Sequence, residues 1–502
     1  CSVLVMLSSE STAEDVLAMW FGAEYFANGP SESHAIKRTN GSLTPSHTFA
    51  AEHANTLEYF DTGWKRWFYG KDVLFDVAQW NTADLIRKAS RGELHDDGWD
   101  LPHGKLAQIL LCDQFTRCAF RGSAEAYAHD SHSLKIAKEL ADSGVFKMSF
   151  LPIERFFVCL ALSHAEDVEL NRLHVQLALQ LADGAPADIV NFFKTLQGFP
   201  HEHFEVIERF GRFPHRNDVL GRATTVEEKT YLESDGCHGW ARSQKKAKLT
   251  YWDGRGLGDP VRFLLEFCLV PFDEENITTR EQFLSFQTSG LGAFGRVPVL
   301  EIDGLRLVEL QAILRYVAGK KNLRGKDLKQ EALADMVVSA TMDVRLALIQ
   351  HRWKDDQPAA LKTWEAQNLV KFSGQLELLL SRYEGPYLCG ECLTYADIVL
   401  LEFLQYSTDE CGDLAGTLSQ APSVFAHFVH MRSFPHVIKY LASPRRKCKP
   451  GDEWVRQTCD ILAMGLPKYL APSKARATKA KAMLVAAALG VAATAAFFRM
   501  RS

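Results

Sequence analysis

One tyrosine of this sequence stands where its hydroxyl could act on a bound anion. Tyr251 is the second-last residue of the short segment Lys248–Trp252, which is typical of a β-strand. A glycine-rich turn follows this segment. A neutral phenol held at a strand end can donate a hydrogen bond to a thiolate and so lower the pKa of the thiol. A free thiol has a pKa of about 8.5, and lowering it by about two units corresponds to roughly 2.7 kcal/mol. We therefore take Tyr251 as a candidate thiol-activating residue; the alternative is a half-buried strand tyrosine.

A mixed sheet is predicted around this tyrosine. Asp259-Pro260 opens a helix with Asp at the N-cap and Pro at the first helical position. Phe272–Ile277 reads as a second strand. The pair Asp303-Gly304 is a type I′ hairpin signal between the runs Val297–Ile302 and Leu305–Val308, and a helix follows. This order fits a thioredoxin-like α/β domain over 248–320.

Several motifs follow one another over residues 248–455: Tyr251–Leu257, Pro260-Val-Arg262, Val297-Pro298, Ala312-Ile-Leu314, Lys321–Gly325, Thr341-Met-Asp343 and Leu393–Asp397. Together they resemble the cytosolic glutathione transferases. The opening motif is similar to the mu class, and the resemblance extends to the alpha and sigma classes. The resemblance implies that an all-helical domain, 327–455, follows the thioredoxin-like domain. Thr394 and Asp397 also form a capping box before an apolar run, which indicates a helix start there.

The resemblance also implies a site for glutathione as co-substrate, beside a small hydrophobic electrophile and without a metal. Tyr251 would be its catalytic residue, and the binding residues would be Trp252, Leu257, Arg296, Val297, Pro298, Glu309, Leu310 and Asp343. Val297 would bind the cysteinyl backbone through a cis peptide before Pro298. Asp343 would reach the γ-glutamyl amine from the neighbouring subunit of a homodimer. The plain alternatives are a trans proline, core positions for Trp252 and Leu257, and a solvated helix carboxylate at 343.

The carboxylate-binding end of this site departs from the family pattern. Family members usually place Gln and then Ser or Thr where this chain has Glu309-Leu310. Leu310 cannot donate a hydrogen bond from its side chain, and Glu309 adds a like charge, which leaves the N–H groups and dipole of the following helix. Arg296, where Asn or Gln is usual, is a candidate replacement partner for a carboxylate. Each lost contact of about 1–1.5 kcal/mol lowers affinity roughly tenfold.

Residues 11–232 carry apolar side chains at spacings of three and four, which predicts an all-helical domain. The segments Leu110–Gly122, Leu151–Phe157, Ser163–Asp167 and His203–Asn217 resemble the mainly bacterial domain of unknown function 924, which implies a tetratricopeptide-like fold and no known reaction. The polar residues of this region are Asp113, Gln114, Arg117, Arg121, His164, Glu166, His203, Arg212, His215 and Arg216. We consider an ion-pair network that ties helices together, an anion or peptide site gripped by the arginines, and a metal site on the histidines.

The composition bounds the remaining possibilities. The chain has 502 residues, a net charge of −5 and 11 cysteines, so it offers no broad nucleic-acid footprint and no dense disulfide framework. A reduced intracellular setting is therefore expected. The spacing of Cys389 and Cys392 is redox-like, but we interpret these cysteines as incidental. The polar segment 233–247 reads as a linker.

The C-terminal stretch 482–498 has no charged residue and is flanked by lysines and arginines. A bilayer core needs about 17–20 apolar residues, so this stretch is predicted to be a tail anchor, with an alanine-rich soluble or surface-lying helix as the alternative. An anchor there would hold the chain at the cytosolic face of an intracellular membrane, and without it the chain would be cytoplasmic.

These observations favour a mainly helical, multidomain glutathione transferase fused to a helical domain of unknown role. A non-catalytic dimeric scaffold or binding protein built on the transferase fold is the alternative. A hydrolase or ligand-binding activity in the helical domain is a third hypothesis, which a pocket with convergent, pKa-perturbed residues would support.

Overall fold

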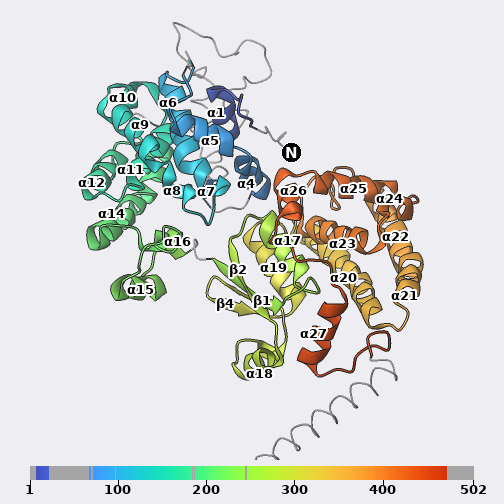
Figure 1. Cartoon of the computed structure of the whole chain (residues 1–502). Coiled ribbons are helices and arrows are strands. Elements are labelled where there is room, and N and C mark those ends of the chain that lie inside the picture. Colours follow the sequence, from blue (N-terminus) through green and yellow to red (C-terminus); the bar gives the residue numbers. More distant parts are fainter. Residues whose placement is uncertain are drawn as a thin grey trace, which may run out of the picture.

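A computed structural model describes residues 7–21, 67–68, 72–95, 98–183, 185, 187–242 and 246–471 (Figure 1). The predicted fold class is confirmed: the protein is mainly helical, with a helical N-terminal region, a thioredoxin-like sheet domain and a second helical domain. The predicted tail anchor, 482–498, lies outside the described residues.

The N-terminal region is helical throughout its described part, as the spacing of its apolar residues predicted. Its elements are α1 (Ala13–Phe21), α4 (Val73–Trp80), α5 (Ala83–Ser90), α6 (Pro102–Ile109), the π-helix η3 (Leu110–Phe115), α7 (Thr116–Ala119), α8 (Glu125–Ala128), α9 (Asp130–Asp142), α10 (Val145–Ser149), α11 (Pro152–Ser163), α12 (Val168–Ala178), α13 (Ala187–Thr195), α14 (Gly198–Phe210), the 3-10 turn η4 (Pro214–Arg216), α15 (Val226–Glu233) and α16 (Gly239–Arg242). Its core is aromatic: the ring of Trp20 lies 5.2 Å from those of Phe115 and Phe157. Helix α16 falls within the segment predicted to be a linker.

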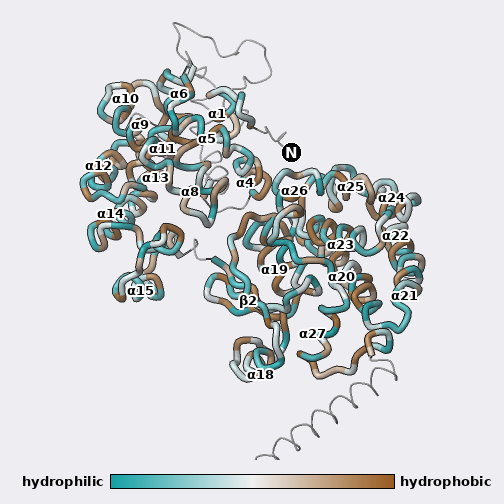
Figure 2. The backbone as a smooth tube through the Cα atoms, viewed as in Figure 1, coloured by the Kyte–Doolittle hydropathy of each residue, from teal (hydrophilic) through white to brown (hydrophobic). Residues whose placement is uncertain are grey.

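The sheet domain has four strands in the order β2-β1-β3-β4. Strand β1 (Ala247–Trp252) is parallel to β2 (Phe272–Ile277) and antiparallel to β3 (Val299–Ile302), which pairs with β4 (Leu305–Leu307). The parallel pair requires a crossover connection, which helix α17 (Asp259–Phe267) provides. Strand β2 lies at the edge of the sheet, and the polar residues in its middle make it hydrophilic (Figure 2).

Local signals in this domain were mostly confirmed. Asp303 and Gly304 both have positive φ, 53° and 80°, as a type I′ hairpin requires. The predicted capping role of Asp259 was wrong: Gly258 is the N-cap residue of α17, and Asp259 instead pairs with Arg262 at 3.1 Å. Helix α18 (Arg280–Thr288), which the apolar spacing did not reveal, joins β2 to β3.

The second helical domain surrounds a long buried helix. Its elements, with α19 of the sheet domain, are α19 (Leu310–Lys320), α20 (Leu328–Gln350), η6 (His351–Trp353), α21 (Gln357–Trp364), the π-helix η7 (Glu365–Leu369), α22 (Val370–Leu380), α23 (Tyr395–Cys411), α24 (Leu414–Thr417), α25 (Pro422–Arg432), α26 (Pro435–Ala442) and α27 (Asp452–Leu462). Helix α23 packs against α17 and α20 and so joins the sheet domain to the helical domain. The predicted capping box begins it: the backbone N–H and hydroxyl of Thr394 each donate to Asp397 at 2.8 Å.

Helix α4 connects the N-terminal region to the rest of the protein (Figure 1). Val73 and Val77 pack into the core that the sheet domain shares with the second helical domain, whereas Phe75 of the same helix packs into the N-terminal core. Between them, the buried carboxylate of Asp76 pairs with Lys321 at 3.4 Å. The two halves therefore share an apolar interface that encloses an ion pair.

Candidate functional site

Strand β1 places the Tyr251 side chain in close contact with the turn that follows. The turn approaches so closely that only glycine fits at the contact positions. Tyr251 is 5% exposed, and a Cβ on Gly256 or Gly258 would overlap its side chain. The backbone N–H of Leu257 donates a hydrogen bond of 2.7 Å to the Tyr251 hydroxyl. A hydroxyl has one hydrogen and two lone pairs, so this contact fixes the oxygen and leaves its hydrogen able to donate elsewhere.

The electrostatic surroundings keep Tyr251 protonated. Burial raises the pKa of its hydroxyl, while the Leu257 N–H and the guanidinium groups of Arg262 and Arg345 oppose that rise without cancelling it. The hydroxyl thus remains a hydrogen-bond donor at neutral pH. This is the protonation state that stabilisation of a neighbouring anion requires.

Two buried arginines, which the sequence analysis missed, hold the turn beside Tyr251. Arg345 of α20 donates to the carbonyl oxygen of Gly256 at 2.7 Å and also pairs with the buried carboxylate of Glu402. Arg262 of α17 donates to the carbonyl oxygen of Gly254 at 2.8 Å. The spacing of residues along a helix does not predict these contacts, because the partners of a buried arginine are set by tertiary packing.

The Val297-Pro298 peptide is cis, as the sequence suggested. It directly precedes Val299, which pairs with Thr250 of β1, the residue before Tyr251. Two residues predicted to bind glutathione therefore lie next to the predicted catalytic residue, although they are about 46 positions away in the sequence. The pairing of β1 with β3 produces this arrangement.

Two of the residues predicted to form the altered carboxylate-binding end, Arg296 and Glu309, pair with each other. Glu309 is the N-cap residue of α19 with a positive φ of 66°, and its side chain does not cap the helix. Its carboxylate instead accepts a hydrogen bond of 3.2 Å from Arg296. Leu310 begins α19 and packs partly against the core. Arg296 and Glu309 are both exposed, so this is a surface ion pair that other charged groups can exchange with.

The remaining predicted residues occupy different environments. Trp252 packs on Phe283, with 5.0 Å between ring centroids, in an apolar cluster that also contains Val297. Leu257 is half-buried in the turn. Asp343 is exposed on α20, and within the described chain it contacts none of the other predicted residues. The chain thus brings together the strand-end residues, and it leaves Asp343 free to face another molecule.

Helix α27 covers the other side of the turn, and the sequence analysis did not include it in the site. A Cβ on Gly254 would overlap the indole of Trp454. Two hydrogen bonds of 2.9 Å hold α27 beside α18. Gln457 donates to the carbonyl oxygen of Thr278, and Arg280 donates to the carbonyl oxygen of Ile461. The proline and charged residues before α27 gave no signal of where this helix would dock.

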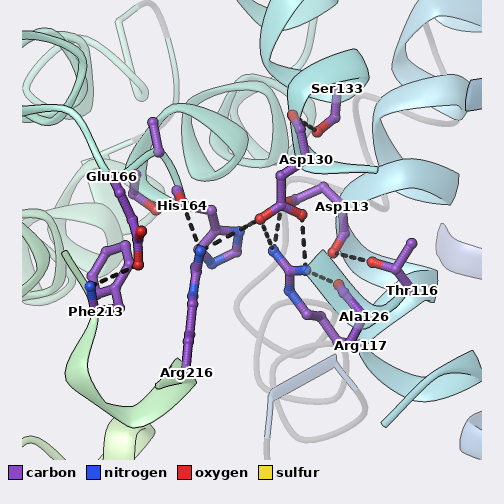
Figure 3. A network of polar contacts seen from close by, with 12 residues as sticks. Asp113, Thr116, Arg117, Ala126, Asp130, Ser133, His164, Glu166, Phe213 and Arg216 are labelled. Atoms are coloured by element: carbon purple, nitrogen blue, oxygen red, sulfur yellow. Dashed lines mark hydrogen bonds and ion pairs between the residues drawn. The ribbon is translucent and has the colours of Figure 1, made fainter. Parts of the chain in front are cut away.

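The N-terminal region brings four of its predicted polar residues, Asp113, Arg117, His164 and Arg216, into one network (Figure 3). Asp113, fully buried, pairs with His164 at 2.7 Å and with Arg117 at 3.3 Å. Arg117 also pairs with Asp130, at 2.8 Å. Figure 3 shows Arg216 beside His164 and Asp130. The interpretation as a helix-tying network therefore holds for Asp113, Arg117 and Asp130, which come from the three helical elements η3, α7 and α9.

Other predicted polar residues lie apart from this network. Glu166 pairs with Arg222 at 2.5 Å and accepts the N–H of Phe213, and Arg212 pairs with Glu228 at 2.6 Å. Arg121 contacts the thiol of Cys118 instead. Nowhere in the described ranges do three His, Cys, Asp or Glu side chains stand close enough to hold a metal ion.

Two further sequence features can be placed. Cys389 is buried and Cys392 half-buried, and both are free thiols, as are the other cysteines that the structure describes. Among the described helices, none is both long enough and apolar enough to cross a bilayer.

Comparison with known proteins matches both halves. Residues 16–236 match the family described as bacterial protein of unknown function (DUF924). Residues 247–319 match the glutathione S-transferase N-terminal domain, and residues 342–444 match the corresponding C-terminal domain.

Several curated glutathione S-transferases match about two fifths of the chain. Glutathione S-transferase A4 is 34% identical in Bos taurus and 33% in Homo sapiens, over 43% of this chain and 97% of each relative. Glutathione S-transferase alpha-4 of Rattus norvegicus is 35% identical over 41% of this chain and 93% of its own length.

Among solved structures, the pi-class glutathione S-transferase of Onchocerca volvulus is 24% identical with a TM-score of 0.36, covering 39% of this chain and 93% of its own. A second structure, NaGST-2, is 26% identical with a TM-score of 0.35, covering 40% and 97%. From these sequence matches, the chain belongs to the glutathione S-transferase family through its second half and carries a DUF924 domain in its first.

Proposed function

We propose that this protein is a glutathione transferase that joins the thiolate of glutathione to small hydrophobic electrophiles. The observation that carries the proposal is the 2.7 Å hydrogen bond from the Leu257 N–H to the Tyr251 hydroxyl. This bond turns the oxygen of Tyr251 toward the turn and leaves its single hydrogen for an incoming sulfur. Because burial raises the pKa of Tyr251, the donor persists when the glutathione thiol ionises.

The proposed chemistry is nucleophilic substitution or addition at carbon. The Tyr251 hydroxyl donates to the sulfur anion and lowers the pKa of the thiol, whose proton leaves to solvent. The sulfur lone pair then forms a bond to an electrophilic carbon, and a leaving group such as chloride departs with its electron pair. Trp252 and Leu257 would supply apolar surroundings for the reacting groups.

Glutathione would be held by backbone and charged groups around this hydroxyl. The backbone of Val297, before Pro298, would bind the cysteinyl part, and the first N–H groups of α19 at Leu310 would face the γ-glutamyl carboxylate. Arg296 would have to leave Glu309 for that carboxylate, which is feasible for an exposed pair. Asp343 would meet the γ-glutamyl amine of the partner in a homodimer.

An absorbance assay with a chloro-dinitrobenzene electrophile tests this proposal in the full-length protein. Tyr251→Phe removes a hydrogen bond to a charged sulfur, worth about 1.5–3 kcal/mol, so turnover should fall about 10- to 100-fold. Circular dichroism of the variant would check that its fold is retained. Equal turnover of the variant and the natural protein would contradict a catalytic role for Tyr251.

A non-catalytic scaffold is the second candidate, and the Arg296–Glu309 ion pair favours it. That pair neutralises the position where a glutathione carboxylate would bind. The scaffold predicts no turnover with or without Tyr251→Phe and no retention on immobilised glutathione. Leu310→Ser restores a side-chain donor at the start of α19, so retention that appears only in this variant would show an impaired carboxylate site. Membrane attachment through 482–498 remains a prediction.

A further inference from the structure

Arg216 of the DUF924 domain is a buried cation held between two aromatic rings. It ends the 3-10 turn η4, and its side chain is 6% exposed. Its guanidinium carbon lies 4.6 Å from the ring centroid of Tyr127 and 4.4 Å from that of Phe213. Such stacking fixes the plane of the guanidinium and leaves its edge for hydrogen bonds.

The polar contacts of Arg216 are too few for a buried guanidinium. Its Nη1 donates to the carbonyl oxygen of His164 at 3.1 Å and reaches Asp130 only at 3.5 Å, while its buried Nε has no hydrogen-bond partner. Asp130 is nearer to Arg117, at 2.8 Å. Burial accordingly lowers the pKa of Arg216. A buried charge is normally paired and saturated with hydrogen bonds, so this one has capacity for an additional anionic partner.

His164 adds an oriented imidazole at the same place (Figure 3). Its Nδ1 lies 2.7 Å from the carboxylate of Asp113, which is fully buried on the π-helix η3. A carboxylate in that position fixes Nδ1 as the donor, so Nε2 keeps its hydrogen-bonding capacity. The imidazole is 17% exposed, and no partner of Nε2 is recorded within the described residues. Short π-helical stretches such as η3 are frequent at functional sites.

Neutral histidines form the surroundings. The ring centroids of His203 and His164 are 6.1 Å apart, and those of His215 and Phe213 are 5.7 Å apart. Burial lowers the pKa of both well below the ordinary value for histidine, so they add polarity without charge. The buried Nδ1 of His215 also has no hydrogen-bond partner. The cluster therefore combines one under-partnered cation with uncharged hydrogen-bonding groups.

We propose that the DUF924 domain binds a small oxyanion, a carboxylate or phosphate group, between the guanidinium of Arg216 and Nε2 of His164. The arginine supplies charge-assisted hydrogen bonds, and the imidazole supplies a second contact of fixed orientation. A purely structural network accounts for Asp113, Arg117 and Asp130, which pair with one another. It does not account for the incomplete contacts of Arg216.

Modification of the natural full-length protein with diethyl pyrocarbonate tests the site without a variant. This reagent acylates accessible imidazole nitrogens, and mass spectrometry of peptides gives the rate at His164. Saturating inorganic phosphate or succinate should slow that rate at least tenfold, whereas His95, 71% exposed, should be unaffected. Equal rates at His164 with and without both anions would overturn the proposal.

Variants then assign the anion to Arg216. In equilibrium dialysis of the full chain, Arg216→Gln should weaken binding of labelled phosphate or succinate at least tenfold, and Arg216→Lys should recover part of it. Arg209→Gln is the matched control, because Arg209 is 53% exposed and pairs with Glu227 on the surface. Binding of phosphate alone would identify a phosphate ligand, and binding of succinate alone a carboxylate. Unchanged affinity in a folded Arg216→Gln protein would overturn the proposal.

Discussion

The two halves of this protein bury arginines to the same extent and use them differently. In the transferase half, Arg262 is fully buried and donates to a carbonyl oxygen and to the carboxylates of Asp259 and Glu274. The shortest N···O distances to these three acceptors are 2.8–3.1 Å. In the DUF924 domain, Arg216 is 5% exposed but has one good acceptor and one carboxylate at 3.5 Å. Burial alone therefore does not distinguish an arginine with a structural role from one that binds a ligand. The number of its donor groups that already have an acceptor makes this distinction.

The well-paired arginines support the candidate site without taking part in it. Arg262 and Arg345 both bind carbonyl oxygens of the glycine turn that encloses the Tyr251 hydroxyl. Every guanidinium nitrogen of both residues donates to an acceptor, so they hold the turn in one position. Preorganisation of this kind is what a catalytic donor requires from its surroundings.

The largest effect should come from breaking a fully buried ion pair. Arg345→Met leaves the buried carboxylate of Glu402 without its cation, which costs about 3–5 kcal/mol. Burial already raises the pKa of Glu402, so the unpaired carboxyl should take up a proton. Urea unfolding followed by circular dichroism would measure the loss.

Arg315→Ala is the control for this comparison. Arg315 is 50% exposed and pairs with Asp335 at 3.2 Å, so its removal should cost less than about 1 kcal/mol. Comparable losses in both variants would mean that the buried pair contributes no more than a surface one.

A smaller effect, dependent on pH, should come from Asp113. Burial alone would raise its pKa, but His164 and Arg117 outweigh burial and lower it to about 2. A carboxyl with a pKa below its unfolded value of about 3.9 stabilises the fold above about pH 4, and this contribution disappears as the pH falls toward 2. Asp113→Asn should therefore cost about 2 kcal/mol at pH 6 and progressively less below pH 4.

Unfolding free energies across pH 2–7 would test this expectation. Asp84→Asn, at an 81% exposed position, should change stability by less than about 0.5 kcal/mol throughout. A difference between Asp113→Asn and the natural protein that did not depend on pH would refute the assigned ion pairs.

The smallest effect should come from Arg216. Arg216→Gln removes one good hydrogen bond and a weak ion-pair contact, so we expect a loss of about 1 kcal/mol in the absence of an anion. Arg262→Gln, which removes a fully buried cation shared by the carboxylates of Asp259 and Glu274, should cost several-fold more. Differential scanning calorimetry of the two variants would compare them directly. A ranking in the opposite order would show that Arg216 is a structural charge after all.

Much of the fold follows from local sequence signals. The Asp303-Gly304 hairpin, the capping box at Thr394 and the strand Phe272–Ile277 all lie where the sequence predicted them. Helix α18 was missed because its apolar residues do not form a clear stripe. The shared role of α4 was also not predictable, since its two faces pack against different halves of the chain.

The site was predicted in part. Tyr251 and the cis peptide at Val297 were identified from their neighbours in the sequence, and the structure brings them together through the pairing of β1 with β3. The docking of α27 over Gly254 and the contact of Arg345 with Gly256 were missed. Those contacts join residues from about 90 to 200 positions apart, for which no local pattern exists.

The sequence by itself determined the elements of this protein and the chemical type of its candidate residues, because propensity, capping and turn chemistry act between near neighbours. Tertiary structure alone decided which of the charged residues are saturated and which are not. Arg345 and Arg216 are both buried arginines, yet Glu402 pairs closely with the first, whereas the described structure gives the second only a carboxylate at 3.5 Å. The energy of a buried charge depends on partners distant in sequence, and those are fixed only when the helices pack.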